Sequence, residues 1–487
     1  MKKYTKSKIK TICFILIFLI LILLILSWLK SSRPEKKMTD ELSPRQEFVS
    51  NNLFDGKIFF NTEINSRLFS KKIIELIESS KNSIEMSVYS ISTPEIISSL
   101  IKKAGAGIDT TIIIPKKKEE FMRNLLNNTK VKLLALGELN DSGSEEDFVH
   151  HKFMIIDSKL DSAKIIFGSS NFTPLQEKYD AGFLIESSDK NVISAYKNEF
   201  DLLKKGNEGT KKLRNFDYRP YDTKINYNDG YFEIWFGPGF KENSIKYRML
   251  ELIKGATKEI DIMAWIFNDA DIAAGLILKA KQGVKIKIIA DDFNFWSEDS
   301  QLQEIFHYNK NSNSNIELVS DAFDNLLIEE KYYKQDTDIV PGFNPYLHHH
   351  TMIIDNNILV TGTNNWTFNG FYRNDEDMII TNINTLVQEF SNFFKLEYTK
   401  NKGETLNFKL GQGDKKLEIM DSLNPKNTVI LYREPFSEEP GTVCLKSTIE
   451  KIKTVVVPEK CITDQTKIYI IDSNFKLLRS NYLSNSL

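Results

Sequence analysis

The sequence is poor in the residue patterns that build most zinc sites. It has 3 cysteines and 6 histidines in 487 residues. It contains neither a His-Glu-x-x-His motif nor a Cys-x-x-Cys pair, the spacings typical of catalytic and structural zinc sites. The lack of both patterns argues against a zinc enzyme and leaves catalysis to organic side chains.

The chain also lacks an excess of charge of either sign. Its formal net charge is -2 and its pI is ≈ 6.4, so no strongly basic field indicates a nucleic-acid partner. A local basic patch would not show in this total. The length predicts about two to three domains, and the hydrophobic content of 41% is ordinary for a globular protein.

Cysteine is too scarce to define a disulfide framework. Cys13 lies in an apolar run, whereas Cys444 and Cys461 lie near the C-terminus. The last two can pair in an oxidising compartment, and two unrelated thiols are an equally good interpretation.

One long hydrophobic run stands at the N-terminus, after a lysine-rich start. A helix over Thr11 to Leu29 would reach about 28 Å, close to the thickness of a bilayer core. No small-x-small cleavage site follows, so residues 1–30 are predicted to be a signal anchor of a single-pass membrane protein with an exported catalytic body. Cleavage of the leader, giving a secreted protein, is the alternative. Residues 31–53 are polar and are predicted to be a linker.

Histidines gather in two short segments instead of spreading along the chain. Val149–Asp157 reads Val-His-His-Lys-Phe-Met-Ile-Ile-Asp, and Leu347–Asp355 reads Leu-His-His-His-Thr-Met-Ile-Ile-Asp. Both are apolar runs closed by an aspartate, which predicts a β-strand. The segments are followed by matching Gly-Ser/Thr-x-Asn elements, at Gly168–Thr173 and Gly362–Thr367.

Side chains two positions apart on a strand point to the same face. The face that would carry chemistry therefore holds His150, Lys152, His348 and His350. The intervening His151 and His349 point the other way and are expected to serve the fold.

This doubled pattern resembles the phospholipase D superfamily, whose signature is His-x-Lys-x4-Asp (the HKD motif) in two copies. The second copy here has histidine where the family has lysine. The signature positions are His150, Lys152 and Asp157, then His348, His350 and Asp355. The resemblance covers about residues 54 to 400 and implies phosphodiester chemistry without a cofactor.

A β-α-β unit also occurs twice. Ser83–Ser90 alternates like a strand, a helix ends at Gly105–Gly107, and Thr110–Ile114 is the next strand. The same unit returns later with Ile84 matching Ile260, Glu85 matching Asp261, Tyr89 matching Trp265, Leu100 matching Leu276, Ala104 matching Ala280 and Gly107 matching Gly283. We expect an α/β fold of two phospholipase D-like half-domains, 54–215 and 228–400, packed with pseudo-twofold symmetry.

The remaining segments carry weaker signals. Gly137–Asp147 and Phe293–Pro345 are long for connections inside a compact domain, so they can form the rim of a site, with solvated insertions as the alternative. Residues 401–487 contain short alternating runs such as Thr428–Tyr432 and Lys467–Ile471, which predict a small β-rich region.

Two histidines that meet across such an interface can cleave a phosphodiester. A neutral imidazole attacks phosphorus to give a phosphohistidine, and its protonated partner gives a proton to the leaving oxygen. The resemblance suggests that His150 attacks and that His348 is the acid. This reaction needs no metal. The three adjacent histidines at 348–350 also make a poor metal site, since they cannot all face one ion on a strand. Asp291 and Asp292 are interpreted as ordinary strand-end carboxylates.

Side chains that bind the phosphate are expected around this pair. They are Lys152, Asn171 and Asn365, with the hydroxyls of Ser169 and Thr363. Asp157 and Asp355 are counted in the catalytic set because they belong to the signature. An odd spacing nevertheless puts them on the opposite face of a regular strand, where they look better suited to bracing the fold.

Each histidine also needs a group that fixes its tautomer. Glu376 resembles the family's orienting acid for His348. The equivalent position in the first half is Gly182, a departure from the family pattern, so we expect Asp180 to orient His150.

The missing second lysine is expected to impair the enzyme without inactivating it. One charge-assisted hydrogen bond is worth about 1.5–3 kcal/mol, so His350 in place of lysine should cost on the order of ten- to a few hundredfold in rate. If His350 becomes a cation in mild acid, activity should climb as the pH falls toward 6.

The family includes phospholipases, phosphatidyl transferases such as cardiolipin synthases, and nucleases. The N-terminal anchor favours a phospholipid substrate at a membrane, cleaved by a chain that acts as a monomer. The alternatives are an anchored or exported metal-independent endonuclease with a nucleic-acid substrate, a cardiolipin synthase-like phosphatidyltransferase, and a degenerate member that binds phosphate-bearing ligands without turnover.

Overall fold

The computed structural model describes residues 46–61, 67–139, 145–214, 222–312, 314–322, 346–411, 416–424, 426–434, 441–448, 455–458, 461–472 and 476–483. The predicted anchor, Thr11–Leu29, lies outside these residues. Within the described part of the chain, no helix is both long enough and apolar enough to cross a bilayer. Residues Arg45–Leu487 form one compact unit.

A 7-stranded sheet forms the first half. β3, β4 and β5 are parallel, and the strands on the other side of β3 are antiparallel. The strands, in their order across the sheet, are β2 (Lys57–Phe60), β10 (Phe183–Ser187), β9 (Lys164–Gly168), β8 (Lys152–Ile156), β3 (Ser83–Val88), β4 (Asp109–Pro115) and β5 (Lys132–Leu136).

A 9-stranded sheet forms the second half and repeats this order and these directions. Two more strands extend its edge. The order is β1 (Gln46–Val49), β11 (Asp222–Tyr227), β12 (Gly230–Phe236), β18 (Asp377–Thr381), β17 (Ile358–Gly362), β16 (His350–Ile354), β13 (Glu259–Ala264), β14 (Lys285–Ala290) and β15 (Ile316–Ser320). The repeated strand order agrees with the predicted duplication of an α/β half-domain.

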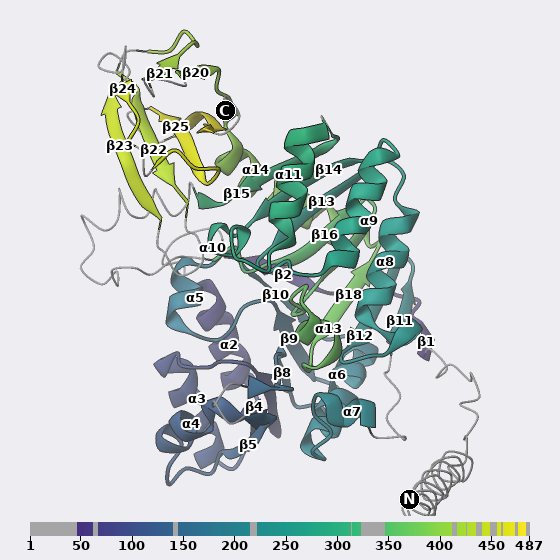
Figure 1. The fold of residues 1–487 in the computed structure, drawn as a ribbon. Helices are drawn as coiled ribbons and strands as arrows, with labels where there is room; N and C mark the ends of the chain where they lie inside the picture. Colours follow the sequence, from purple (N-terminus) through teal and green to yellow (C-terminus); the bar gives the residue numbers. More distant parts are fainter. Residues whose placement is uncertain are drawn as a thin grey trace, which may run out of the picture. The chain divides into compact units, whose positions relative to one another are not determined.

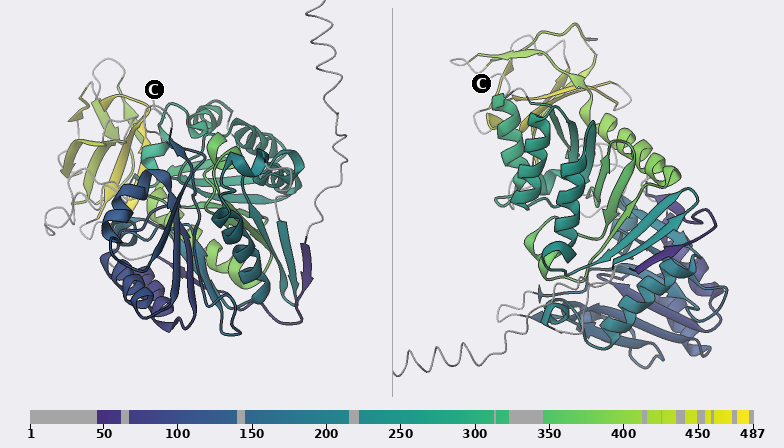
Figure 2. Two further views of the ribbon diagram at one scale, coloured as in Figure 1. Left: turned by 90° about the horizontal axis from the view of Figure 1, so that it is seen from below. Right: turned by 90° about the vertical axis from the view of Figure 1, so that its right-hand side faces the viewer.

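Helices lie in three layers around the two sheets (Figures 1 and 2). One layer covers the outer face of the first sheet, one covers the outer face of the second, and one lies between the sheets. The layer on the first sheet comprises α2 (Leu68–Ser79) and α3 (Pro94–Gly105). The layer on the second sheet comprises α8 (Ile245–Gly255), α9 (Ala270–Lys281) and α11 (Gln301–Ser312). The layer between the sheets comprises α6 (Lys190–Lys204) and α14 (Asn384–Lys402).

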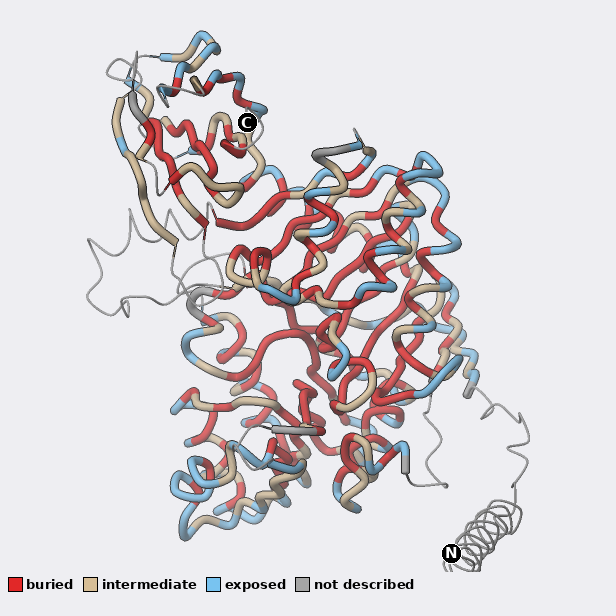
Figure 3. The backbone as a smooth tube through the Cα atoms, viewed as in Figure 1, coloured by how far each residue is buried: buried red, intermediate tan, exposed pale blue. Residues whose placement is uncertain are grey.

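The alternation of side chains along β8 shows how the sequence builds these layers. Phe153 and Ile155 enter the core shared by the two sheets, whereas Met154 and Ile156 face the core under α2 and α3. A strand buried on both faces reads as a continuous apolar run, and Figure 3 shows such buried strands in both halves.

Two segments that were predicted to lack regular structure belong to the second sheet. The predicted linker 31–53 includes β1, which pairs in parallel with β11. The predicted insertion Phe293–Pro345 contains most of α10 (Asp292–Phe295) together with α11 and β15, the counterparts of α4 (Glu119–Leu125) and β5. Only 313 and 323–345 of that segment lie outside the described residues.

The C-terminal region is β-rich, as predicted. Its 5-stranded sheet comprises β19 (Glu404–Thr405), β26 (Leu477–Tyr482), β25 (Thr466–Ile471), β22 (Thr428–Arg433) and β23 (Thr442–Thr448). A disulfide joins Cys444 to Cys461. Glu434 accepts a hydrogen bond of 2.7 Å from the indole of Trp296, which ties this region to the second half.

Candidate active site

The two histidine-rich segments meet where the halves join. His150 lies just before β8 and His348 just before β16. The backbone N–H of His150 donates to the carbonyl of Asp375 at 2.9 Å, and that of Ala181 donates to the carbonyl of Tyr346 at 3.0 Å. Each segment therefore pairs with the other half of the chain. The rings lie close enough together for His150 to lower the pKa of His348.

One carboxylate holds the ring of His150. Its Nδ1 lies 2.8 Å from Oε2 of Glu376 and 3.1 Å from the carbonyl oxygen of Thr363. A carbonyl can only accept, so Nδ1 carries the proton and Nε2 keeps a free lone pair. The hydroxyl of Thr363 and the amide of Asn374 donate to the same carboxylate, at 2.8 and 3.3 Å.

These donors favour the ionised form of Glu376, whereas burial disfavours it and raises its pKa to about 8. Below about pH 8 the carboxyl group of Glu376 therefore keeps a proton, and the carboxylate that accepts from Nδ1 of His150 forms as the pH rises through this value. The prediction that Glu376 orients His348 is wrong, because the acid reaches across to the histidine of the other half.

His348 has no such support in the described part of the chain. The position equivalent to Glu376 is Gly182, where a Cβ would lie 2.1 Å from Oγ of Ser170. Among the described residues, neither ring nitrogen of His348 has a side-chain partner, although a backbone contact with Ser169 acts to raise its pKa, as Thr363 does for His150. Burial lowers its pKa well below the usual value, and the nearby Lys152 lowers it further.

Asp180, which was predicted to orient His150, lies beside the strand segment that leads to His348. Its Oδ1 accepts the backbone N–H of Tyr346 at 3.1 Å, and burial raises its pKa well above the usual value. Since the carboxylate against His150 is that of Glu376, the role predicted for Asp180 is wrong.

The two positions that follow the histidines differ in charge. The Nζ of Lys152 donates to the carbonyl of His150 at 2.6 Å, and burial lowers the lysine pKa to about 8. His350 is 3% exposed, and burial, followed by the neighbouring His348, lowers its pKa well below the usual value. This direction opposes the expectation that His350 becomes a cation near pH 6, which stays a prediction.

The two signature aspartates brace the fold. Asp157 accepts the backbone N–H groups of Lys81, Asn82 and Ser83. Asp355 does the same for residues 257–259. Each carboxylate closes the turn that leads into β3 or β13, which agrees with the strand alternation and not with the place of the two residues in the catalytic set.

The four predicted phosphate-binding residues divide into two kinds. The hydroxyl of Ser169 accepts the backbone N–H of Phe183 at 3.2 Å, and that of Thr363 is bonded to Glu376. Ser169 is thus bonded to the backbone and Thr363 to the carboxylate beside His150, and their contact with a phosphate stays a prediction. Asn171 and Asn365 each keep a buried side-chain oxygen with no partner among the described residues, which suits residues that await a ligand.

The inner histidines, His151 and His349, are both 0% exposed and lie behind the catalytic face, in agreement with the sequence. His151 is bonded to Asp377 at 3.1 Å and to Glu199 at 3.0 Å. His349 stacks on Phe183 instead, with ring centroids 5.7 Å apart.

Aromatic side chains around the two outer histidines were not assigned a role from the sequence. Tyr89 lies 5.0 Å from His150, and Trp265 lies 4.5 Å from His348, between ring centroids. The indole Nε1 of Trp265 is buried and has no partner among the described residues. The repeat alignment already matched Tyr89 with Trp265, and this match was the available signal.

Strand-end carboxylates lie next to this centre. Ligand atoms of Asp291, Asp292 and Asp321 lie within 4.8 Å of one another. Asp291 accepts the backbone N–H of Leu347 at 3.3 Å, and Asp321 accepts that of Asp292 at 2.7 Å. The bond of Asp291 braces the approach to His348. The three carboxylates could together hold a metal ion, so the structural interpretation of Asp291 and Asp292 stays a prediction.

Comparison with known proteins matches the two halves separately. Residues 73–204 and 249–397 match the family model described as cardiolipin synthase, PLD-like domain. Together these stretches cover more than half of the chain.

Curated relatives match over a shorter length. The mitochondrial cardiolipin hydrolase of Xenopus laevis is 20% identical over 161 residues, which cover 33% of this chain and 64% of the relative. That of Homo sapiens is 24% identical over 148 residues, which cover 30% of this chain and 48% of the relative. The chain thus spans less than two thirds of either relative.

Among solved structures, the phosphatidylserine synthase of Haemophilus influenzae superposes with a TM-score of 0.51 at 12% identity. The match covers 71% of this chain and 86% of that one. At this identity the likeness shows a shared fold.

Proposed function

Since the chain belongs to the phospholipase D superfamily, through two matches to its cardiolipin synthase, PLD-like domain, we propose that it is a phosphodiesterase that hydrolyses or transfers phosphatidyl groups of phospholipids. The relatives named for cardiolipin hydrolysis support the choice of a lipid. The observation that carries the proposal is that, among the residues that the structure describes, His150 is held by a carboxylate and the facing His348 is not.

That asymmetry divides the roles. Glu376 fixes the Nδ1 proton of His150 and makes Nε2 the nucleophile. His348 has no carboxylate to hold a proton, so its protonated form is a strong acid. A bound phosphodiester is an anion, which offsets the burial that lowers the pKa of His348 and lets this ring take up a proton as the substrate binds.

The reaction then follows in two steps. Nε2 of His150 attacks phosphorus, the P–N bond forms, and the P–O bond to the leaving alcohol breaks as His348 gives its proton to that oxygen. Next, water or an acceptor alcohol attacks phosphorus and gives its proton to His348. The P–N bond breaks, and both histidines return to their starting state.

Three groups are placed to hold the phosphoryl oxygens. Lys152 supplies a positive charge on the side of His150. On the side of His348, where the second lysine is missing, we assign its role as a donor to the buried indole N–H of Trp265. The side-chain amides of Asn171 and Asn365 complete the set.

The location that fits this chemistry is a membrane surface outside the cytosol. The N-terminal apolar run Thr11–Leu29 would hold the body beside a bilayer. The disulfide between Cys444 and Cys461 suits an oxidising compartment. Whether the run stays attached or is cleaved decides between an anchored and a secreted form.

The proposal is tested by incubating the full-length protein with a panel of phospholipid vesicles and, separately, with plasmid DNA. We expect release of phosphatidate or of a transphosphatidylation product, abolished in His150→Ala and retained in His307→Ala, a matched control at an exposed histidine. Cleavage of DNA with no lipid product would replace the proposal by the nuclease alternative. No turnover of either substrate would leave a phosphate-binding protein.

A further inference from the structure

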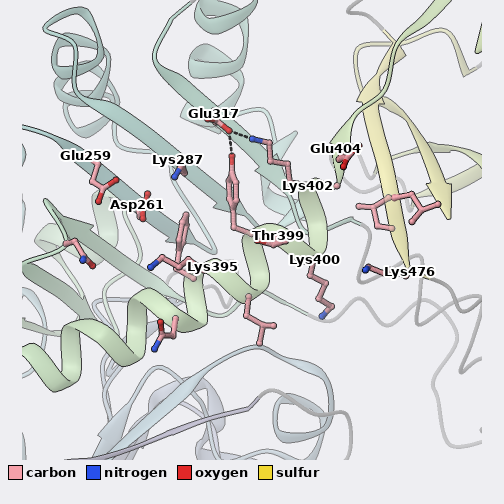
Figure 4. Close-up of a pocket in the computed structure, with 18 residues that line it drawn as sticks. Glu259, Asp261, Lys287, Glu317, Lys395, Thr399, Lys400, Lys402, Glu404 and Lys476 are labelled. Atoms are coloured by element: carbon pink, nitrogen blue, oxygen red, sulfur yellow. Dashed lines mark hydrogen bonds and ion pairs between the residues drawn. The ribbon is translucent and has the colours of Figure 1, made fainter. Parts of the chain in front are cut away.

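A second cavity lies away from the paired histidines, beside α14. It has a volume of ≈ 1200 Å³ and is lined by β13, β14 and β15, by α14, and by the start of β26. Figure 4 shows Glu259, Asp261, Lys287 and Lys395 near one end of it, and Glu404 and Lys476 near the other.

The floor of the charged end is built by strand register. Asp261 on β13 lies directly opposite Lys287 on β14, which lies opposite Glu317 on β15. Glu317 is already engaged, since it accepts the hydroxyl of Tyr398 at 2.8 Å and is paired with Lys402. The groups left for a ligand are therefore Asp261 and Lys287.

Asp261 is short of partners for a half-buried carboxylate. Its Oδ1 is buried and has no hydrogen-bond partner among the described residues. Burial raises its pKa to about 6, and Lys287 and Lys395 lower it in part. Glu259, Asp261, Lys287 and Lys395 all line the cavity, and two of them carry each sign.

The first half shows that this is a departure from the repeat. Glu85, the residue that matches Asp261, forms an ion pair with Lys197 of α6 at 3.5 Å. The residue of α14 that corresponds to Lys197 is Ser391, whose hydroxyl donates to Asn356. The second half thus has no cation at the position of Lys197, and the cations that act on Asp261 are Lys287 and Lys395, which line the cavity with it.

We propose that this cavity binds a zwitterionic ligand of the phosphoethanolamine type, with its ammonium on Asp261 and Glu259 and its phosphate on Lys287 and Lys395. Two charges of each sign complement a ligand that carries both signs and no net charge. An unpaired charged group in a half-buried site gains most from a charge-assisted hydrogen bond.

The size and the walls favour a head group over a free amino acid. Small-molecule sites have volumes of about 300–1,000 Å³, and this one is larger. Beyond the charged end it is lined by Leu396, which is 54% exposed, and by Leu477 and Leu478. These leucines lie among further charged side chains, such as Glu404 and Lys476, and offer contact to the start of acyl chains. The site requires no catalysis and does not depend on the proposed reaction.

The test uses titration calorimetry on the full-length protein carrying His150→Ala, which removes the proposed nucleophile. The probes are glycerophosphoethanolamine, glycerol 3-phosphate, ethanolamine and phosphatidylethanolamine vesicles. We expect Asp261→Asn and Lys395→Met each to weaken binding of glycerophosphoethanolamine at least about tenfold. Lys254→Met, at an exposed lysine of α8, is the matched control and should change nothing.

The single-charge probes and the vesicles separate the alternatives. Asp261→Asn should spare glycerol 3-phosphate, and Lys395→Met should spare ethanolamine. If glycerol 3-phosphate binds as well as the zwitterion, or if both variants bind all probes like the parent, the proposal is overturned. Binding of vesicles that exceeds binding of the soluble head group identifies a lipid, and equal binding identifies a free phospho-amine.

Discussion

The two halves share a strand order but fill equivalent positions with opposite chemistry. Behind the first catalytic histidine, His151 lies among polar side chains, which raise its pKa to about 9 despite burial. Behind the second, burial lowers the pKa of His349 to about 3. His151 contacts Asp377 and Glu199, and Tyr196 is bonded to the same Asp377. Around His349, the residues at the positions equivalent to these three are, in the same order, Phe183, Phe393 and Phe390.

The same asymmetry reaches the catalytic face. Glu376 and Lys152 both contact His150, whereas the corresponding positions around His348 are Gly182 and the neutral His350. A duplicated fold can therefore keep its symmetry in the backbone while it concentrates charge around one of two equivalent rings. In our account that ring is the nucleophile.

Removing the carboxylate from the charged side should have the largest effect. We expect Glu376→Gln to lower kcat by about 10²- to 10⁴-fold, because the Nδ1 proton of His150 is no longer fixed by an ionised partner. The parent should have a narrow optimum near pH 8. Activity rises as Glu376, with a pKa of about 8, loses its proton and falls as Lys152, also about 8, loses its charge.

A pH profile of kcat/KM checks this. The rise on the acid side should disappear in Glu376→Gln. Activity of the parent that increases toward pH 6 would contradict the account.

Substitution of the two inner histidines, His151 and His349, should lower the free energy of unfolding by very different amounts. His151→Leu removes one hydrogen bond from each of two buried carboxylates, Asp377 and Glu199, and should cost about 3–5 kcal/mol of unfolding free energy. His349→Phe enters an aromatic cage and should cost less than about 1.5 kcal/mol. Urea unfolding measures both. Equal losses would show that the two environments are equivalent.

The pH dependence of that stability has a definite sign. The pKa of His151 is raised on folding to about 9, so its contribution is fully present below about pH 6.5 and is lost as the pH rises through 9. The loss should amount to ~3 kcal/mol. His151→Leu should lack this loss between pH 6 and 10.

Adding the missing cation should have a smaller effect. We expect His350→Lys to raise turnover about tenfold or more at neutral pH, because a charge-assisted hydrogen bond to the phosphate is regained. The gain should come mainly in kcat. If the variant folds and shows no gain, binding of the phosphate in the second half does not need a further cation.

The smallest change is expected at Trp265. Trp265→Phe keeps the ring and removes the N–H, and it should lower kcat/KM about tenfold. In the His350→Lys background the same change should cost less, because lysine then supplies the donor. Tyr89→Phe is the matched control in the other half. Equal losses in the two backgrounds would remove Trp265 from the phosphate site.

Much of the fold and of the site could be predicted from short sequence patterns and from the internal repeat. The apolar run of β8, the glycine stop after α3 and the duplicated motif all depend on neighbours along the chain, and the strand alternation correctly assigned Asp157 and Asp355 to the fold. The cross-pairing of Glu376 with His150 was missed because it depends on how two halves face each other. Likewise, the low pKa of His350 follows from burial, which no spacing reveals.

The central claim is that His150, held by Glu376, is the one histidine that bonds to phosphorus. The direct measurement is mass spectrometry of acid-labile phosphohistidine after a rapid quench with a phosphodiester whose leaving group needs no acid. In His348→Ala we predict that the adduct accumulates on residue 150, and in Glu376→Gln that it forms slowly. An adduct on His348 in the parent, or turnover that persists in His150→Ala, would contradict the account.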